Sequence, residues 1–116
     1  MSITRHDTRP RMSQVVIHGN VAYLAGQVGD SHTDSIADQT QQALNAIDGL
    51  LAKAGTDKTK LLTTTIWLAD IRNFEEMNGV WDAWTAPDCA PARACIEAKQ
   101  APPGWGVEIM VTAALD

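Results

Sequence analysis

Two ionisable side chains near the C-terminal end of the chain have the chemistry to bind and process a small acid. Arg93 opens a run of alternating residues, Ala-Arg-Ala-Cys-Ile-Glu, and Glu108 stands between Val107 and Ile109 in a second such run. A guanidinium can hold a carboxylate with two parallel hydrogen bonds, and a glutamate can position water or move protons. Whether the two groups act together depends on the elements that carry them.

Both runs have the alternation of β-strands, over roughly residues 92–99 and 107–114. Residues 102–104, Pro-Pro-Gly, separate the runs, because proline neither donates ladder hydrogen bonds nor continues a strand. Side chains alternate between the two faces of a strand. The apolar positions of each run therefore predict a face toward a core. Arg93 and Glu108 are predicted to share the other face, away from the helices.

The same alternation is typical of any half-exposed hairpin, whose outward charges are ordinarily solvated. A simple hairpin register pairs Glu97 with Glu108 and leaves Arg93 further along the sheet. The pattern alone thus favours ordinary surface charges, and contact between Arg93 and Glu108 does not follow from spacing.

The first quarter of the chain predicts a β-hairpin. Two β-rich runs, 15–18 and 21–25, flank Gly19-Asn20, and both of these residues tolerate the positive φ that two-residue hairpin turns require. A further strand at 3–7 is an optional leading element. A polar loop is expected from Gln27 to Thr33.

An amphipathic helix is predicted next, since Ser35 offers a capping side chain with Asp38 three residues later, and Gly55 supplies a C-terminal stop. Its apolar residues recur at helical spacing: Ile36, Ala43, Leu44, Ile47, Leu50, Leu51 and Ala54.

Residues 61–69 are rich in threonine and β-branched residues, which predicts a strand, and a second helix carries an apolar stripe ending near Pro87. The stripe comprises Phe74, Met77, Val80, Trp81 and Trp84, and it indicates core packing. The order is β-β-α-β-α-β-β, an α+β fold with two helices on one face of a mixed sheet. Apolar side chains remain for the other face, so self-association is expected.

The 116 residues are enough for one compact domain, over residues 1–116, and too few for two. The chain has 9 Lys and Arg against 14 Asp and Glu, a net charge of −5, without a basic cluster. This balance argues against nucleic acid as a partner. No apolar run approaches the ~20 residues of a membrane span, and the N-terminus lacks a signal-peptide core. A cytoplasmic location is expected, with Cys89 and Cys95 as free thiols.

Motifs for metals and nucleotide cofactors are missing from the sequence. His6, His18 and His32 are dispersed and fall in no metal-ligand spacing. The chain has no GxGxxG, P-loop or GxSxG motif. We expect no metal and no cofactor.

The segment Pro-Ala-Arg-Ala-Cys-Ile at 91–96, followed by the loop and Val-Glu-Ile at 107–109, resembles the C-terminal signature of the RidA/YjgF family. Gly19-Asn20 followed by Leu-Ala-Gly-Gln at 24–27 is similar to that family's first hairpin. Asp70, Asn-Phe at 73–74 and Met-Asn at 77–78 resemble its second helix. The resemblance spans essentially the whole chain.

This resemblance implies a chorismate-mutase-like (Bacillus type) domain that forms homotrimers, with clefts between neighbouring subunits. The best-known activity of the family is hydrolysis of reactive enamines and imines, such as 2-aminoacrylate, to 2-keto acids and ammonia. No metal or organic cofactor is required. The substrate would be a small carboxylate, and the enzyme would be a hydrolase acting on C=N bonds.

The resemblance also implies site residues. Arg93 matches the carboxylate-binding arginine, and Glu108 is the candidate general base and acid. Cys95 matches a strand cysteine that contributes mainly through its backbone, although a small packed residue is an equal alternative. Gly26 matches a glycine whose backbone approaches the ligand, or it is only a turn glycine. Asn78 matches a helix residue beside the cleft, or it caps or bridges locally.

One position departs from the family pattern. Met12 stands where well-studied imine deaminases have a tyrosine, which indicates a divergent branch and leaves substrate preference open. Trp105 either lines the cleft or packs within its loop. Two alternatives to hydrolysis remain: a trimeric module that binds 2-keto acids with little turnover, and the historical ribonuclease activity, against which the acidic balance counts.

Overall fold

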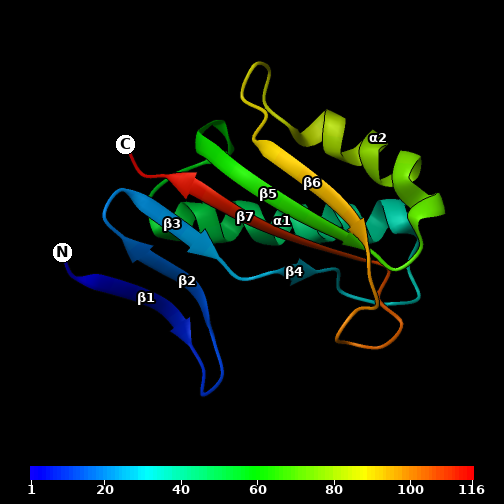
Figure 1. Ribbon diagram of the computed structural model, residues 1–116, viewed down its shortest axis with the longest axis horizontal. Coiled ribbons are helices and arrows are strands. Elements are labelled where there is room, and N and C mark those ends of the chain that lie inside the picture. The colour runs from blue at the N-terminus through cyan, green and yellow to red at the C-terminus, as the bar shows by residue number, and fades with distance from the viewer.

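The structure is a computed structural model that describes residues 1–116. Its elements in chain order are strands β1 (Ile3–Thr8), β2 (Ser13–His18), β3 (Val21–Leu24) and β4 (Gln27–Val28), helix α1 (Ile36–Ala54), 3-10 turn η1 (Lys58–Lys60), strand β5 (Leu61–Leu68), 3-10 turn η2 (Ile71–Asn73), helix α2 (Phe74–Trp84), and strands β6 (Ala92–Glu97) and β7 (Val107–Ala114). The strands form one mixed sheet in the order β1-β2-β3-β7-β5-β6, and β4 also pairs with β7 (Figure 1).

The N-terminal strands form an antiparallel meander. The leading strand β1 is present and pairs with β2, and β2 pairs with β3 through the predicted turn. Only Gly19 has positive φ, at 62°, so the expectation that both turn residues adopt positive φ is wrong. Positive φ at the first central residue alone is the pattern of a type II′ turn, which glycine adopts without a Cβ clash.

Helix α1 begins and ends where the sequence predicts. The Ser35 side chain accepts a hydrogen bond from the backbone N–H of Asp38, and Gly55 closes the helix in the left-handed conformation at φ 90°. Its buried apolar residues share one stripe because they recur every three or four positions. That stripe covers one face of the sheet, so α1 is the main cover of the core.

The strands after α1 are arranged differently from a hairpin. β6 pairs with β5 in parallel, through the crossover that contains α2, and β7 pairs with β5 on its other edge. The prediction that the last two strands follow one another as a hairpin is therefore wrong. A parallel pair needs a crossover of about a dozen residues, which η2 and α2 supply here.

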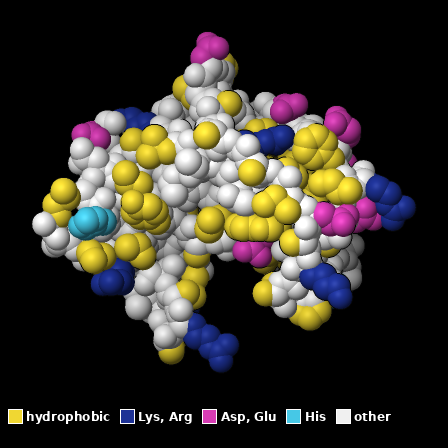
Figure 2. Space-filling model, in the orientation of Figure 1, with side chains coloured by type: hydrophobic (Ala, Val, Ile, Leu, Met, Phe, Trp, Pro, Cys, Tyr) yellow, Lys and Arg dark blue, Asp and Glu magenta, His cyan; other side chains and the backbone are white.

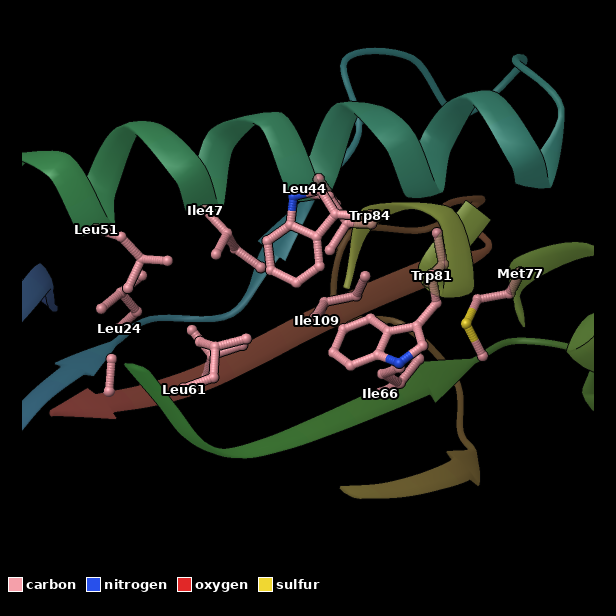
Figure 3. Close-up of a cluster of buried hydrophobic side chains, with 14 of the residues drawn as sticks. Leu24, Leu44, Ile47, Leu51, Leu61, Ile66, Met77, Trp81, Trp84 and Ile109 are labelled. Carbon is pink, nitrogen blue, oxygen red and sulfur yellow. The ribbon is translucent and has the colours of Figure 1, made fainter. Parts of the chain in front are cut away.

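Both helices lie on one face of the sheet, as predicted. Leu44 and Ile47 of α1, Trp81 and Trp84 of α2, and Ile109 of β7 meet in a single buried cluster (Figure 3). Two layers around one core make this an α+β fold. None of the helices is both long and apolar enough to cross a membrane.

We call the sheet face opposite the helices the open face. Tyr23 and Ile96, each 48% exposed, and Met110, 37% exposed, lie on it. Figure 2 shows hydrophobic side chains spread over the strands. The outer edges of β1 and β6 are unpaired within the chain. Exposed apolar side chains and free strand edges favour pairing with further copies.

Candidate functional site

The guanidinium of Arg93 is held against helix α2. Its Nη1 donates a 2.8 Å hydrogen bond to Oδ1 of Asn78. Its Cζ lies 5.7 Å from the ring centroid of Phe74 and 5.6 Å from that of Trp81. No carboxylate of the chain forms an ion pair with Arg93. The cation is thus oriented by neutral groups, and its remaining donors are free to bind an anion.

Phe74 and Trp81 are site residues that the sequence analysis assigned only to the core. They stand four residues before and three residues after Asn78, so the three side chains share one face of α2. That spacing links the aromatic pair to Asn78 in the sequence. It identifies them as neighbours of Arg93 only when strand β6 is known to lie against this face of the helix.

Cys95 lies on the same strand face as Arg93 and packs against the edge of the core. Burial raises the pKa of its thiol, against the opposing influence of the nearby Arg93 guanidinium. A raised pKa keeps the sulfur protonated at neutral pH, so the thiol is a poor nucleophile there. Cys89 is also a free thiol, as predicted.

The prediction that Arg93 and Glu108 share a face of the sheet is wrong. Arg93 is aligned with Thr64 of β5, whose side chain is buried beneath the helices, whereas Glu108 is aligned with Trp67. Positions 64 and 67 differ by an odd number, so their side chains point to opposite faces. Within one chain, Arg93 faces the helix side and Glu108 faces the open side. Their Cα atoms are roughly 14 Å apart at ordinary strand spacings.

Glu108 is a solitary carboxylate whose position is set by Gly26. A Cβ added to Gly26 would stand 2.1 Å from Oε2 and 2.9 Å from Cδ of Glu108, so only a glycine leaves the carboxylate where it is. Gly26 lies where the chain passes from β3 to β4, both of which run along β7. Glu108 has no ion pair within the chain.

The neighbours of Glu108 on the open face are apolar. Across the sheet, Val28, Glu108, Trp67 and Ile96 occupy one row of aligned positions. Trp67 was not among the predicted site residues, because its pairing with Glu108 depends on the register of two strands about 40 residues apart. Glu108 is the one ionisable residue of this row.

The last two predicted site residues lie apart from Arg93. Trp105 donates from Nε1 to the carbonyl oxygen of Gly29 at 3.0 Å and packs on His32, with ring centroids 5.0 Å apart. Met12 lies at the turn between β1 and β2, where it is 39% exposed and its carbonyl accepts from the N–H of Arg9. The structure thus brings together Arg93, Asn78 and Cys95 as one group, and Glu108 with Gly26 as another.

Known proteins are similar to this chain in sequence and fold. The profile of the family described as Endoribonuclease L-PSP matches residues 3–115. A RutC family protein of Haemophilus ducreyi is 48% identical over 98% of this chain and 97% of its own length. A human protein named 2-iminobutanoate/2-iminopropanoate deaminase is 31% identical over 87% of this chain and 77% of its own.

Among solved structures, NMB1025 of Neisseria meningitidis, described as a member of the YjgF protein family, superposes with a TM-score of 0.96. It is 43% identical, and the match covers 100% of this chain and 97% of that one. The fold is therefore chorismate-mutase-like, as the resemblance implied. With nearly every residue inside the matched region, the chain belongs to the Endoribonuclease L-PSP family, which includes the YjgF, RidA and RutC proteins.

Proposed function

We propose that the protein hydrolyses 2-imino and 2-enamino acids to 2-keto acids and ammonia. The observation that carries this proposal is the Arg93 guanidinium, oriented by Asn78 and two aromatic rings and left without an acidic partner in its own chain. Such a cation is preorganised for a small carboxylate, because the protein has already restricted its rotamers. The relationship to the human 2-iminobutanoate/2-iminopropanoate deaminase supports the same reaction class.

Each group has a distinct part in this reaction. Arg93 grips the substrate carboxylate with its free N–H donors, which fixes the planar C=N group. Glu108 orients a water molecule and accepts a proton as the oxygen bonds to the imine carbon. That proton is passed to nitrogen to give the carbinolamine. A second transfer, from the new hydroxyl group to nitrogen, accompanies cleavage of the C–N bond, so ammonia leaves and the carbonyl of the keto acid forms. Water is the only co-reactant, so the atoms balance without a cofactor.

The site we propose lies between two copies of the chain. Arg93 and Glu108 face opposite sides of the sheet in one chain, so a small substrate touches both only if they come from different copies. The exposed apolar open face and the free edge of β6 support such an assembly. A homotrimer gives one such cleft per neighbouring pair, and free thiols fit a reducing, cytoplasmic setting.

The reaction is tested with 2-iminobutanoate generated in situ by a threonine dehydratase, with semicarbazide as the competing trap. The wild-type protein is expected to raise keto-acid release and lower semicarbazone formation, and Arg93→Ala is expected to abolish both effects. Arg72→Ala, at an arginine 87% exposed and paired with Asp70, is the matched control. Equal rates for wild type and Arg93→Ala would overturn the proposal.

The shared site is tested by mixing inactive chains. When Arg93→Ala and Glu108→Gln chains assemble together at random, about a quarter of the interfaces receive an intact arginine from one copy and an intact glutamate from the next. Co-assembled protein should therefore regain about that share of the wild-type rate. If mixed assemblies stay inactive while each variant folds and assembles, the site is not shared between copies.

A 2-keto acid binding module with little turnover is the second candidate. It is favoured by Met12, which cannot donate a proton where the related deaminases carry a tyrosine. Calorimetry separates the two functions: binding of 2-oxobutanoate that depends on Arg93, in a protein that does not accelerate imine hydrolysis, supports the module.

A further inference from the structure

A cavity of about 430 Å³ opens where strands β5 and β6 end and β7 begins, beside the loop that hangs below β6 and β7 in Figure 1. Ala69 and Gly106 line it, together with Pro103, Gly104 and Trp105 from the loop. Lys99 and Gln100 also line it. A cavity of this volume lies within the range of small-molecule sites, and its methyl, ring and glycine walls suit an apolar group.

The cavity lies beyond the ends of the strands that carry Glu108, Trp67 and Ile96. The N–H of Ala69 donates to the carbonyl oxygen of Gly106 at 3.0 Å, which extends the β5–β7 ladder beyond Leu68 and Val107. Ala69 follows Trp67 by two residues, and Trp67 is aligned with Glu108, so the side chains of Ala69 and Glu108 face the same side of the sheet. Two strand residues span about 7 Å. A ligand held at Glu108 therefore reaches the cavity with a side chain of a few bonds.

The aromatic wall of the cavity is already fixed in place. Trp105 is held by its hydrogen bond to Gly29 and by contact with His32, so the polar edge of its indole is occupied and ring carbon remains for a ligand. Gln39, only 2% exposed, accepts from the N–H of Gly106 at 2.9 Å and donates to the carbonyl of Asp34 at 2.8 Å. Because these contacts already fix the loop, little conformational entropy is lost when a ligand binds against it.

We infer that this cavity accepts the side chain of the substrate, and that it makes the protein prefer 2-imino acids with large apolar or aromatic side chains over the smallest ones. The inference rests on the proposed function for its placement beside Glu108. The carboxylate and the C=N group stay between Arg93 and Glu108, and the side chain of the substrate extends past Ala69 toward the Trp105 ring.

Binding of product-like acids tests the inference without turnover. Calorimetry should give phenylpyruvate an affinity at least about tenfold higher than pyruvate, as expected for several buried carbon atoms. Ala69→Leu places a larger side chain in the cavity from an exposed position, and it should remove this advantage while leaving pyruvate affinity within about twofold. Ala52→Leu, an exposed alanine on α1, is the matched control.

Turnover gives the second readout. An amino-acid oxidase supplies 2-imino acids from phenylalanine, leucine and alanine, and Ala69→Leu should lower kcat/KM for the first two by about tenfold and leave the third nearly unchanged. Trp105→Ala removes the aromatic wall and enlarges the cavity, so it should lower kcat/KM most for the substrate derived from phenylalanine. This variant replaces Ala69→Leu as the test if Ala69→Leu does not fold.

The two proposals fail in different ways. Hydrolysis with no preference for large side chains, or an Ala69→Leu loss equal for all substrates, overturns the side-chain cavity and leaves the deaminase intact. If the protein does not hydrolyse imines but binds phenylpyruvate tightly, and Ala69→Leu weakens that binding, the deaminase proposal is overturned and the side-chain cavity is supported. Absence of both effects overturns both.

Discussion

Nη1 of Arg93 and Oδ1 of Asn78 lie 2.8 Å apart in a hydrogen bond that joins strand β6 to helix α2. The bond fixes one arm of an exposed guanidinium on the helix side of an edge strand. Since both partners are accessible to solvent, the contact contributes more to orientation than to stability.

Asn78→Ala should lower kcat/KM for imine hydrolysis by about tenfold, mainly by raising KM. Without Asn78 the Arg93 side chain is mobile in the free protein, so the entropy cost of ordering it falls on substrate binding. The thermal midpoint should change little. Asn45→Ala on α1, which removes an exposed amide bonded only to Gln41, is the control. A drop in kcat with unchanged KM would contradict a positioning role.

Arg93→Lys should cost at least about a hundredfold in kcat/KM although the charge is kept. An ammonium cannot form the two parallel hydrogen bonds with a carboxylate, and it cannot stack in the same way on Phe74 and Trp81. Steady-state kinetics on 2-iminobutanoate check this. Activity close to wild type would show that a point charge suffices.

Glu108→Gln should abolish most hydrolysis, by about a hundredfold, while binding of 2-keto acids by calorimetry persists. The substitution keeps the shape of the side chain but removes the proton acceptor. Glu75→Gln on the exposed side of α2 is the matched control. Loss of keto-acid binding in Glu108→Gln would instead assign Glu108 to ligand anchoring.

Gly26→Ala should displace the Glu108 carboxylate, because the new methyl group would overlap Oε2. We expect at least a tenfold loss of kcat. Gly49→Ala is the matched control: no atom lies within 4 Å of the added methyl in α1, so activity should persist and stability should rise by up to ~1 kcal/mol. Full activity in Gly26→Ala would show that the position of Glu108 is not critical.

Cys95 should react slowly with iodoacetamide at pH 8, and its rate should keep rising to higher pH than that of free cysteine. Burial raises its folded pKa above the unfolded value near 8.5, so the folded state keeps the proton where the unfolded chain has lost it. The resulting loss of stability begins as pH rises through about 8.5 and is absent at pH 7. Cys95→Ala should remove that part of the pH dependence, measured by urea unfolding of wild type and variant.

Local sequence determined the elements of this protein. The Ser35 cap, the apolar spacing of α1 and the Gly55 stop define a helix, because each acts within a few residues. The motif around Arg93 and Glu108 likewise indicates the family from the sequence alone. Strand β4 was missed, since two residues carry too little periodicity to separate a strand from a loop.

Tertiary structure alone decided which way Arg93 points. Alternation determines the two faces of one strand relative to each other, but it does not say which face meets the helices. On β6 the alanines at 92 and 94 looked like the core face, yet parallel pairing with β5 turns Arg93 and Cys95 toward α2. The insertion of β5 between β6 and β7 then places Glu108 on the opposite side. That choice depends on long-range register, which no local pattern encodes.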